Sequence, residues 1–162
     1  MQNDETSNDV NEFGDDFWTP LMHAVEDGDM ERFESLVAGG ANINLGNMEE
    51  ETYPITLAAE NGREEMFFSL VELGANLDVE CYCCPTCDMW YCFNKADLFC
   101  AAIESGSVRI ARYLRFMGVR PWSRTRSMRI NGKTVFGFAK ELGREDFLKS
   151  VFSVSELEPK KE

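Results

Sequence analysis

The chain has 162 residues, 44% of them hydrophobic, so it can bury the core of one domain. It contains no run of roughly 18 or more apolar residues, so we predict no membrane-spanning helix. Residues 1–16 are acidic and polar without an apolar stretch, which argues against a secretory signal. We therefore expect a cytoplasmic protein.

The charge is divided unevenly along the chain. Residues 1–80 contain 20 acidic and 2 basic residues, a net charge of −18, whereas residues 81–162 contain 9 and 14, a net charge of +5. An acidic protein repels nucleic acid and anionic lipid, so we expect neither to bind and predict a basic protein as partner. The alternative is that the excess charge only maintains solubility.

Two segments of the chain repeat one pattern 34 residues apart. Residues 19–24 read Thr-Pro-Leu-Met-His-Ala and residues 53–58 read Tyr-Pro-Ile-Thr-Leu-Ala. In both, a glycine stands four residues after the final alanine, and Gly-Ala-Asn begins sixteen residues after it. Weaker copies begin at Asp97 and Thr134, and the last of them lacks the later glycine. A fixed period of this length is typical of a solenoid whose terminal unit is atypical.

The pattern resembles the ankyrin repeat, which opens on Thr-Pro-Leu-His-x-Ala and has a period of about 33. The resemblance covers residues 15–152 and implies an all-α solenoid of stacked helix pairs with hairpin loops. The repeats that it implies lie at about 17–48, 51–80, 95–120 and 132–154. An acidic disordered tail (1–15) would precede them and a charged tail (155–162) would follow. The histidine position of the family is occupied by Met22, Thr56, Cys100 and Gly137. The loss of that histidine predicts a less stable array than the family consensus.

Local physical chemistry supports paired helices. Thr19 can cap a helix whose first residue is Pro20, where the missing N–H has no partner to lose. Glycines suit the turns that follow, because they tolerate a positive φ. Apolar residues recur at helical spacing in each second helix, and we predict these as core: Phe33, Leu36, Val37, Phe67, Leu70, Val71, Ile110, Tyr113, Leu114, Phe147, Leu148 and Val151.

A cysteine-rich insertion separates the second and third repeats. The aligned alanines are 34, 44 and 37 residues apart, so roughly ten residues are inserted at about 81–94. Five of the six cysteines lie there; the sixth, Cys100, aligns with a helical position and is predicted as a core thiol. Cys84-Pro-Thr-Cys87 has the spacing of a zinc knuckle. The predicted zinc ligands are Cys81, Cys84, Cys87 and Cys92, with Cys83 as a substitute. A redox-active pair and reduced, packed thiols are the alternatives.

Catalysis has no support among the residues. The one histidine, His23, is followed by glutamate one place too late for the H-x-E pattern of a zinc deaminase. A single histidine also leaves no supported Ser-His or Cys-His pair. We therefore expect no enzyme activity.

A smaller basic insertion at 120–133 carries Trp122 and could touch nucleic acid or an acidic protein. The strongly acidic character of the whole chain argues against nucleic acid.

A glutamate recurs two residues after the aligned alanine of every repeat. Stacking would set these four residues in a row at about 10 Å intervals: Glu26, Glu60, Glu104 and Glu141. The other contact residues that we predict are Met48, Glu49 and Glu50 on the first hairpin and Trp122 on the smaller insertion. Ankyrin proteins typically bind through first helices and hairpin tips, so this acidic concave face predicts a basic partner. The alternative is that glutamate is only a good exposed helix residue.

The sequence thus predicts a monomeric, non-catalytic interaction module that serves as a scaffold or inhibitor. Immunity proteins, antitoxins against basic toxins and host-directed effectors all suit its size and charge. The competing interpretation is a zinc-stabilised or redox-sensing protein that acts through the Cys81–Cys92 loop.

Overall fold

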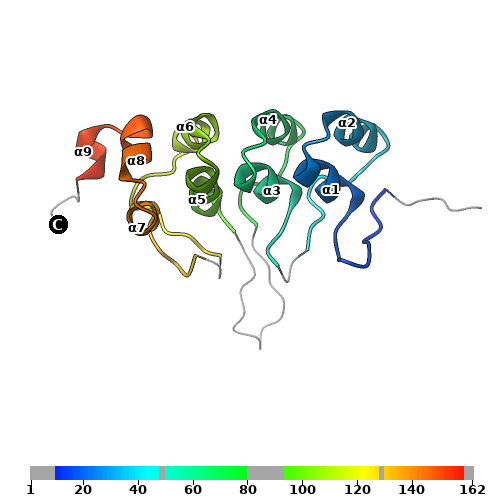
Figure 1. Ribbon diagram of the computed structural model, residues 1–162, viewed down its shortest axis with the longest axis horizontal. Coiled ribbons are helices and arrows are strands. Elements are labelled where there is room, and N and C mark those ends of the chain that lie inside the picture. Colours follow the sequence, from blue (N-terminus) through cyan, green and yellow to red (C-terminus); the bar gives the residue numbers. More distant parts are fainter. Residues whose placement is uncertain (1–9, 48–49, 80–92, 128–129, 159–162) are drawn as a thin grey trace, which may run out of the picture.

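Four helix pairs stand side by side in a computed structural model that describes residues 10–47, 50–79, 93–127 and 130–158 (Figure 1). The pairs are α1 (Pro20–Asp27) with α2 (Met30–Ala38), α3 (Pro54–Glu60) with α4 (Glu64–Glu72), α5 (Lys95–Ser105) with α6 (Val108–Phe116), and α7 (Val135–Glu141) with α8 (Glu145–Val151). A short helix, α9 (Val154–Leu157), follows the last pair. The described residues form isolated β-bridges but no strand, so the predicted all-α fold is confirmed.

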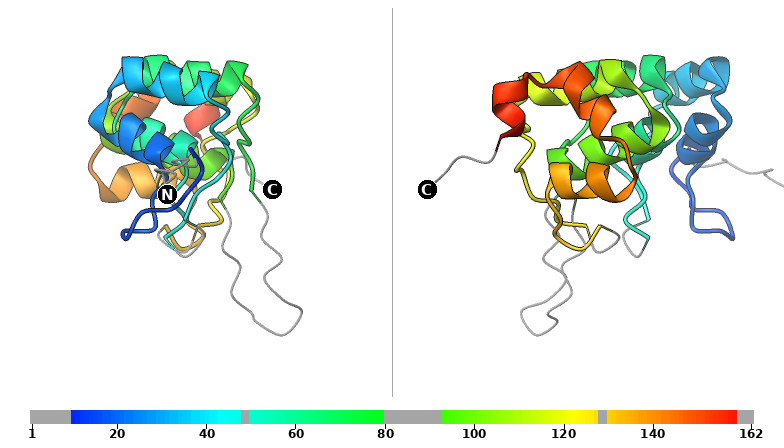
Figure 2. Two further views of the ribbon diagram at one scale, coloured as in Figure 1. Left: turned by 90° about the vertical axis from the view of Figure 1, so that its right-hand side faces the viewer. Right: turned by 60° about the vertical axis from the view of Figure 1, so that its left-hand side comes forward.

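The helices form two layers. The first helices of the pairs, α1, α3, α5 and α7, make an inner layer from which the connecting hairpins project, and α2, α4, α6 and α8 lie behind them (Figures 1 and 2). Each inner helix contacts the next along the row, and α6 contacts both α4 and α8 in the outer layer. None of the helices in the described part of the chain has the length and apolarity that a membrane crossing requires.

Helix ends follow the sequence signals. The hydroxyl of Thr19 accepts a hydrogen bond from the backbone N–H of Met22 at 3.2 Å, with Pro20 at the first position of α1. Gly28 ends α1 with a φ of 73°, a left-handed conformation that favours glycine. The Asp29 carboxylate then accepts from Arg32 N–H at 3.0 Å and starts α2. These caps fix the tight turn within the first pair.

The core lies between the layers and between neighbouring pairs. Every apolar residue that the spacing assigns to the second helices is buried or packs against the buried cluster, so this prediction is confirmed. Phe67 of α4 and Phe99 of α5 are fully buried, and Phe99 stacks on Phe152 with ring centroids 5.4 Å apart. A helix pair cannot bury these faces alone, so stacking itself stabilises the fold.

Polar bonds also join successive pairs. Each of three side chains donates to a backbone carbonyl near the end of the preceding inner helix. Arg63 bonds to Glu26 O at 2.9 Å, and Ser105 Oγ bonds to Ala59 O at 2.8 Å. Arg144 Nη1 completes the series and donates to Ile103 O of α5 at 2.5 Å. These carbonyls belong to the last turns of their helices, where the ordinary i+4 partner is missing, so the bonds help to satisfy the helix ends while they hold the repeats in register.

A hairpin precedes the first repeat, and an asparagine bond joins it to the next connection, as happens again one repeat later. Asn11 Oδ1 accepts from Asn42 N–H at 2.6 Å, and Asn44 Oδ1 accepts from Asn76 N–H at 2.8 Å one repeat later. Gly14 N–H donates to Trp18 O at 2.9 Å and closes the first hairpin. This hairpin lies below α1, on the side where the later hairpins project (Figure 1).

Candidate partner-binding surface

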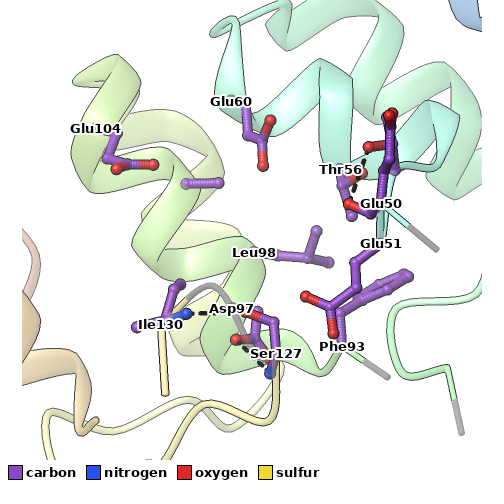
Figure 3. Close-up of a pocket in the computed structure, with 12 residues that line it drawn as sticks. Glu50, Glu51, Thr56, Glu60, Phe93, Asp97, Leu98, Glu104, Ser127 and Ile130 are labelled. Carbon is purple, nitrogen blue, oxygen red and sulfur yellow. Dashed lines mark hydrogen bonds between the residues drawn. The ribbon is translucent and has the colours of Figure 1, made fainter. Parts of the chain in front are cut away.

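A groove opens on the inner face of the row where the second and third repeats meet (Figure 3). The hairpin before α3, the helices α3 and α5, and the hairpin after α6 contribute its walls. Its lining residues are Glu50, Glu51, Thr52, Thr56, Glu60, Phe93, Asp97, Leu98, Ala101, Glu104, Ser127 and Ile130. We call this set of residues the acidic groove.

Charge and apolar surface are combined in the acidic groove. Five of its lining residues carry carboxylates, and no lining residue is Lys or Arg. Leu98 lies between the carboxylates, and Phe93 and Ile130 form its apolar neighbours (Figure 3). These three side chains are buried in the body of the protein and present only their edges. The groove can therefore accept a chain that has an apolar stem and a positive end.

Asp97 joins two segments of the fold through its buried carboxylate. Its side chain is only 6% exposed. Its Oδ2 accepts from the backbone N–H groups of Asn94 and Arg126, both at 2.9 Å, and its Oδ1 accepts from Ser127 N–H at 3.1 Å. Asp97 thus anchors the hairpin after α6 to the start of α5 and positions one wall of the groove.

Hydrogen bonds close the hairpin before α3 and cap the helix that follows it. Asn47 and Thr52 exchange backbone hydrogen bonds at 2.8 and 2.9 Å, and Glu51 between them has a φ of 54°. Thr56 accepts from Tyr53 N–H at 2.8 Å and donates to Tyr53 O at 2.9 Å at the start of α3. The hairpin therefore leads directly into a capped inner helix. This connection holds Glu50 and Glu51 on the side of the array where the groove opens.

Residues 3–81 match the family model described as ankyrin repeats in three copies. The stacked helix pairs and projecting hairpins continue the same architecture through α8. The chain is an ankyrin-repeat protein. Ankyrin repeats generally mediate protein–protein interaction and are typically non-catalytic. No curated protein matches the chain.

Within the ankyrin array, two members of the predicted glutamate row meet in the groove. Glu60 of α3 and Glu104 of α5 occupy equivalent positions and both point into it (Figure 3). Glu50 of the preceding hairpin lines the same groove. Glu26 instead accepts from Asn61 Nδ2 at 2.5 Å, and Glu141 accepts from Lys133 Nζ at 2.6 Å. Neither Glu26 nor Glu141 lines the groove.

Most of the other predicted contact and metal residues lie outside the described part of the chain, and one lies inside it. Met48 and Glu49 lie outside the described residues, as do the proposed zinc ligands Cys81, Cys83, Cys84, Cys87 and Cys92. Trp122 lies within the described ankyrin array but away from the groove. Its ring packs on Phe136 with centroids 5.0 Å apart, and the residue is 38% exposed.

His23 also has a defined place in the array. Its Nε2 lies 3.1 Å from Asp16 Oδ2, and its ring centroid is 5.4 Å from that of Trp18. The side chain is half-buried on α1, on the face towards the first hairpin. These contacts place His23 at the surface of a first helix, partly covered by the first hairpin.

Asp97 is not among the predicted contact residues, although the sequence before it carries a helix-capping signal. The repeat alignment sets Asp97 opposite Thr19, the cap of α1. In the structure α5 begins three residues earlier, because Asn94 Oδ1 accepts from Ala96 and Asp97 N–H at 2.8 and 3.2 Å. An Asn three residues before an Asp is a capping-box pattern. Asp97 is therefore inside the helix and can reach the next hairpin.

Proposed function

We propose that this ankyrin-repeat protein binds a basic segment of a partner protein along the acidic groove and acts as a scaffold or inhibitor. The observation that supports the proposal is the groove itself, with five carboxylates around Leu98 and no basic lining residue. A Lys or Arg side chain can lay its methylene stem on apolar surface and pair its charged end with carboxylates. Glu60 and Glu104 offer such pairing from neighbouring repeats.

A defined peptide tests the proposal before any natural partner is known. We expect a fluorescently labelled peptide of alternating Arg and Gly to bind at low salt, and a Glu-Gly peptide of equal length not to bind. Charges at a protein surface are screened within about 10 Å at 0.1 M salt. Affinity for the Arg-Gly peptide should therefore fall on the order of tenfold between low and high salt. Fluorescence anisotropy measures this. Equal binding of both peptides contradicts the proposal.

We also propose that the cysteine segment forms a structural zinc site, which rests on one observation next to it. Val79 N–H donates to Phe93 O at 2.9 Å, and the two residues form an antiparallel bridge. The chain therefore returns to its starting point across the segment that carries five of the six cysteines. Thiolates that are close together can supply the tetrahedral ligands that Zn²⁺ prefers.

Thiol chemistry separates this zinc site from ordinary cysteines. Burial, helped by the nearby carboxylates of Asp97 and Glu104, raises the pKa of the Cys100 thiol far above its usual range. Cys100 should therefore resist iodoacetamide in the native protein, since the thiolate is the reactive form. We expect about one zinc per chain, and four thiols besides Cys100 that become reactive only after chelation. Mass spectrometry of labelled peptides and metal analysis test this. Metal-free protein with five reactive thiols contradicts the zinc site.

A further inference from the structure

The hairpin before the first repeat carries an exposed aromatic side chain in an unfavourable backbone conformation. Phe17 has a φ of 59° and is 69% exposed. Phe17 N–H donates to Gly14 O, and Gly14 N–H donates to Trp18 O, both at 2.9 Å. This is the three-residue hairpin in which the residue after the turn is left-handed and glycine is favoured. A phenylalanine there strains the backbone and exposes apolar surface to water.

The neighbouring repeat shows that the strain is a property of the position and the exposure is a property of this residue. Glu51 stands 34 residues later with a φ of 54°, so the equivalent position of the next hairpin is also left-handed. Glu51 is a polar residue that lines the acidic groove, whereas Phe17 is apolar and protrudes. Phe13 of the same hairpin is also 40% exposed. We call these two exposed phenylalanines of the first hairpin, Phe13 and Phe17, the aromatic tip.

The hairpin that carries the aromatic tip is hydrogen-bonded to the acidic groove through Trp18. Trp18, the residue after Phe17, donates from Nε1 to Glu50 Oε2 at 3.5 Å, and Glu50 is a groove residue. The hairpin of the aromatic tip and the hairpin that carries Glu50 project to the same side of the array (Figure 1). A ligand in the groove therefore needs only to extend by one repeat to reach Phe17.

Charge around the aromatic tip defines the chemistry of what can cover it. Exposed Glu12, Asp15 and Asp16 surround the two phenylalanines in sequence. Exposed aromatic side chains with an acidic rim suit a segment that alternates apolar and basic residues, since aromatic faces also attract cations. A purely apolar segment would leave the rim desolvated and unpaired.

We infer that the aromatic tip anchors an apolar residue of the same basic partner that occupies the acidic groove. This inference rests on the proposed function and narrows it. The partner segment should combine Lys or Arg with at least one large apolar side chain, and Phe17 should be the residue that selects for it. Phe17 is then a specificity residue, and its strain and exposure are explained by contact in the complex.

Two peptides and two matched variants of the full chain test the inference. The Arg-Gly peptide is compared with the same peptide in which some glycines are replaced by leucine. Wild-type protein should bind the leucine peptide on the order of tenfold more tightly, as expected for burying one large apolar side chain. Phe17→Asn should abolish that preference and lower affinity for the leucine peptide far more than affinity for the Arg-Gly peptide. Glu51→Asn, at the equivalent left-handed position, should weaken binding of both peptides and keep the preference for the leucine peptide.

Stability and mass measurements identify other occupants of the aromatic tip. Asn tolerates a positive φ, so Phe17→Asn should keep or raise Tm, by about 2–4 °C if the strain is fully relieved. A lower Tm would mean that the chain itself covers Phe17, and a wild-type dimer lost in Phe17→Asn would mean that a second copy does; either result overturns the inference. An unchanged leucine preference in Phe17→Asn overturns it while the proposed function stands. If an uncharged Gln-Leu peptide binds as well as the leucine peptide, the proposed function fails instead.

Discussion

Replacing Asp97 with alanine is expected to lower the free energy of unfolding by about 3 kcal/mol. The reason is the position of its buried carboxylate, which accepts three backbone N–H groups from two separate segments. Bonds to a charged acceptor contribute more than neutral ones, and their loss leaves buried donors without a partner. Urea denaturation followed by circular dichroism measures the change.

Two further variants separate the hydrogen bonds of Asp97 from its charge. Asp97→Asn keeps one carbonyl oxygen as acceptor but turns the other site into a donor, so we expect an intermediate loss. Glu104→Ala removes a carboxylate from the same helix at an exposed position and should change stability by less than about 0.5 kcal/mol. If Asp97→Ala and Glu104→Ala have equal effects, the anchoring role of Asp97 is wrong.

Loss of the Asp97 anchor should also reach the groove. Arg126 and Ser127 are held through their backbone N–H groups, and Ile130 follows on the same hairpin, where it forms part of the groove wall. Without the carboxylate this hairpin loses two of its bonds to the start of α5 and keeps the bond from Asn94 Nδ2 to Arg124 O at 3.0 Å. We therefore link the stability of the third repeat to the shape of the proposed binding surface.

The helix pairs were predictable because their signals are local. Thr19 and Pro20 mark the start of α1 within two residues of sequence, and apolar spacing marks each outer helix without reference to any other segment. The start of α5 was less visible, since the alignment of repeats favours Asp97 as the cap, whereas Asn94 competes for the role and caps the helix earlier. A repeat alignment carries the average of the repeats and not the capping of each one.

The fate of the glutamate row depends on partners that sequence spacing does not show. All four glutamates occupy equivalent positions, which is a local property. Glu26 is bonded by Asn61 from the next repeat, and Glu141 by Lys133 from the preceding hairpin. Glu60 and Glu104 line one groove from the neighbouring helices α3 and α5, which pack side by side. The alignment shows which residues are equivalent, and the packing around each of them decides which share a groove.

Reversing the charge of Glu60 and Glu104 together is expected to weaken binding of the Arg-Gly peptide about a hundredfold. Each reversal removes one attraction and adds one repulsion, which we take as about 1.4 kcal/mol per site for partly exposed charges. Anisotropy titration of the Glu60→Lys, Glu104→Lys protein at low salt measures the loss. The effect should shrink at high salt, because screening weakens attraction and repulsion alike.

The matched control is the double variant Glu34→Lys, Glu72→Lys. Both residues are exposed on the outer helices α2 and α4, and their reversal changes the net charge by the same amount. If the groove binds the peptide, this control should lose much less affinity than the groove variant, since its charges lie in the other layer. Equal losses in the two variants would show that overall charge attracts the peptide without a defined site. The comparison therefore distinguishes a binding groove from an acidic surface that only keeps the protein in solution.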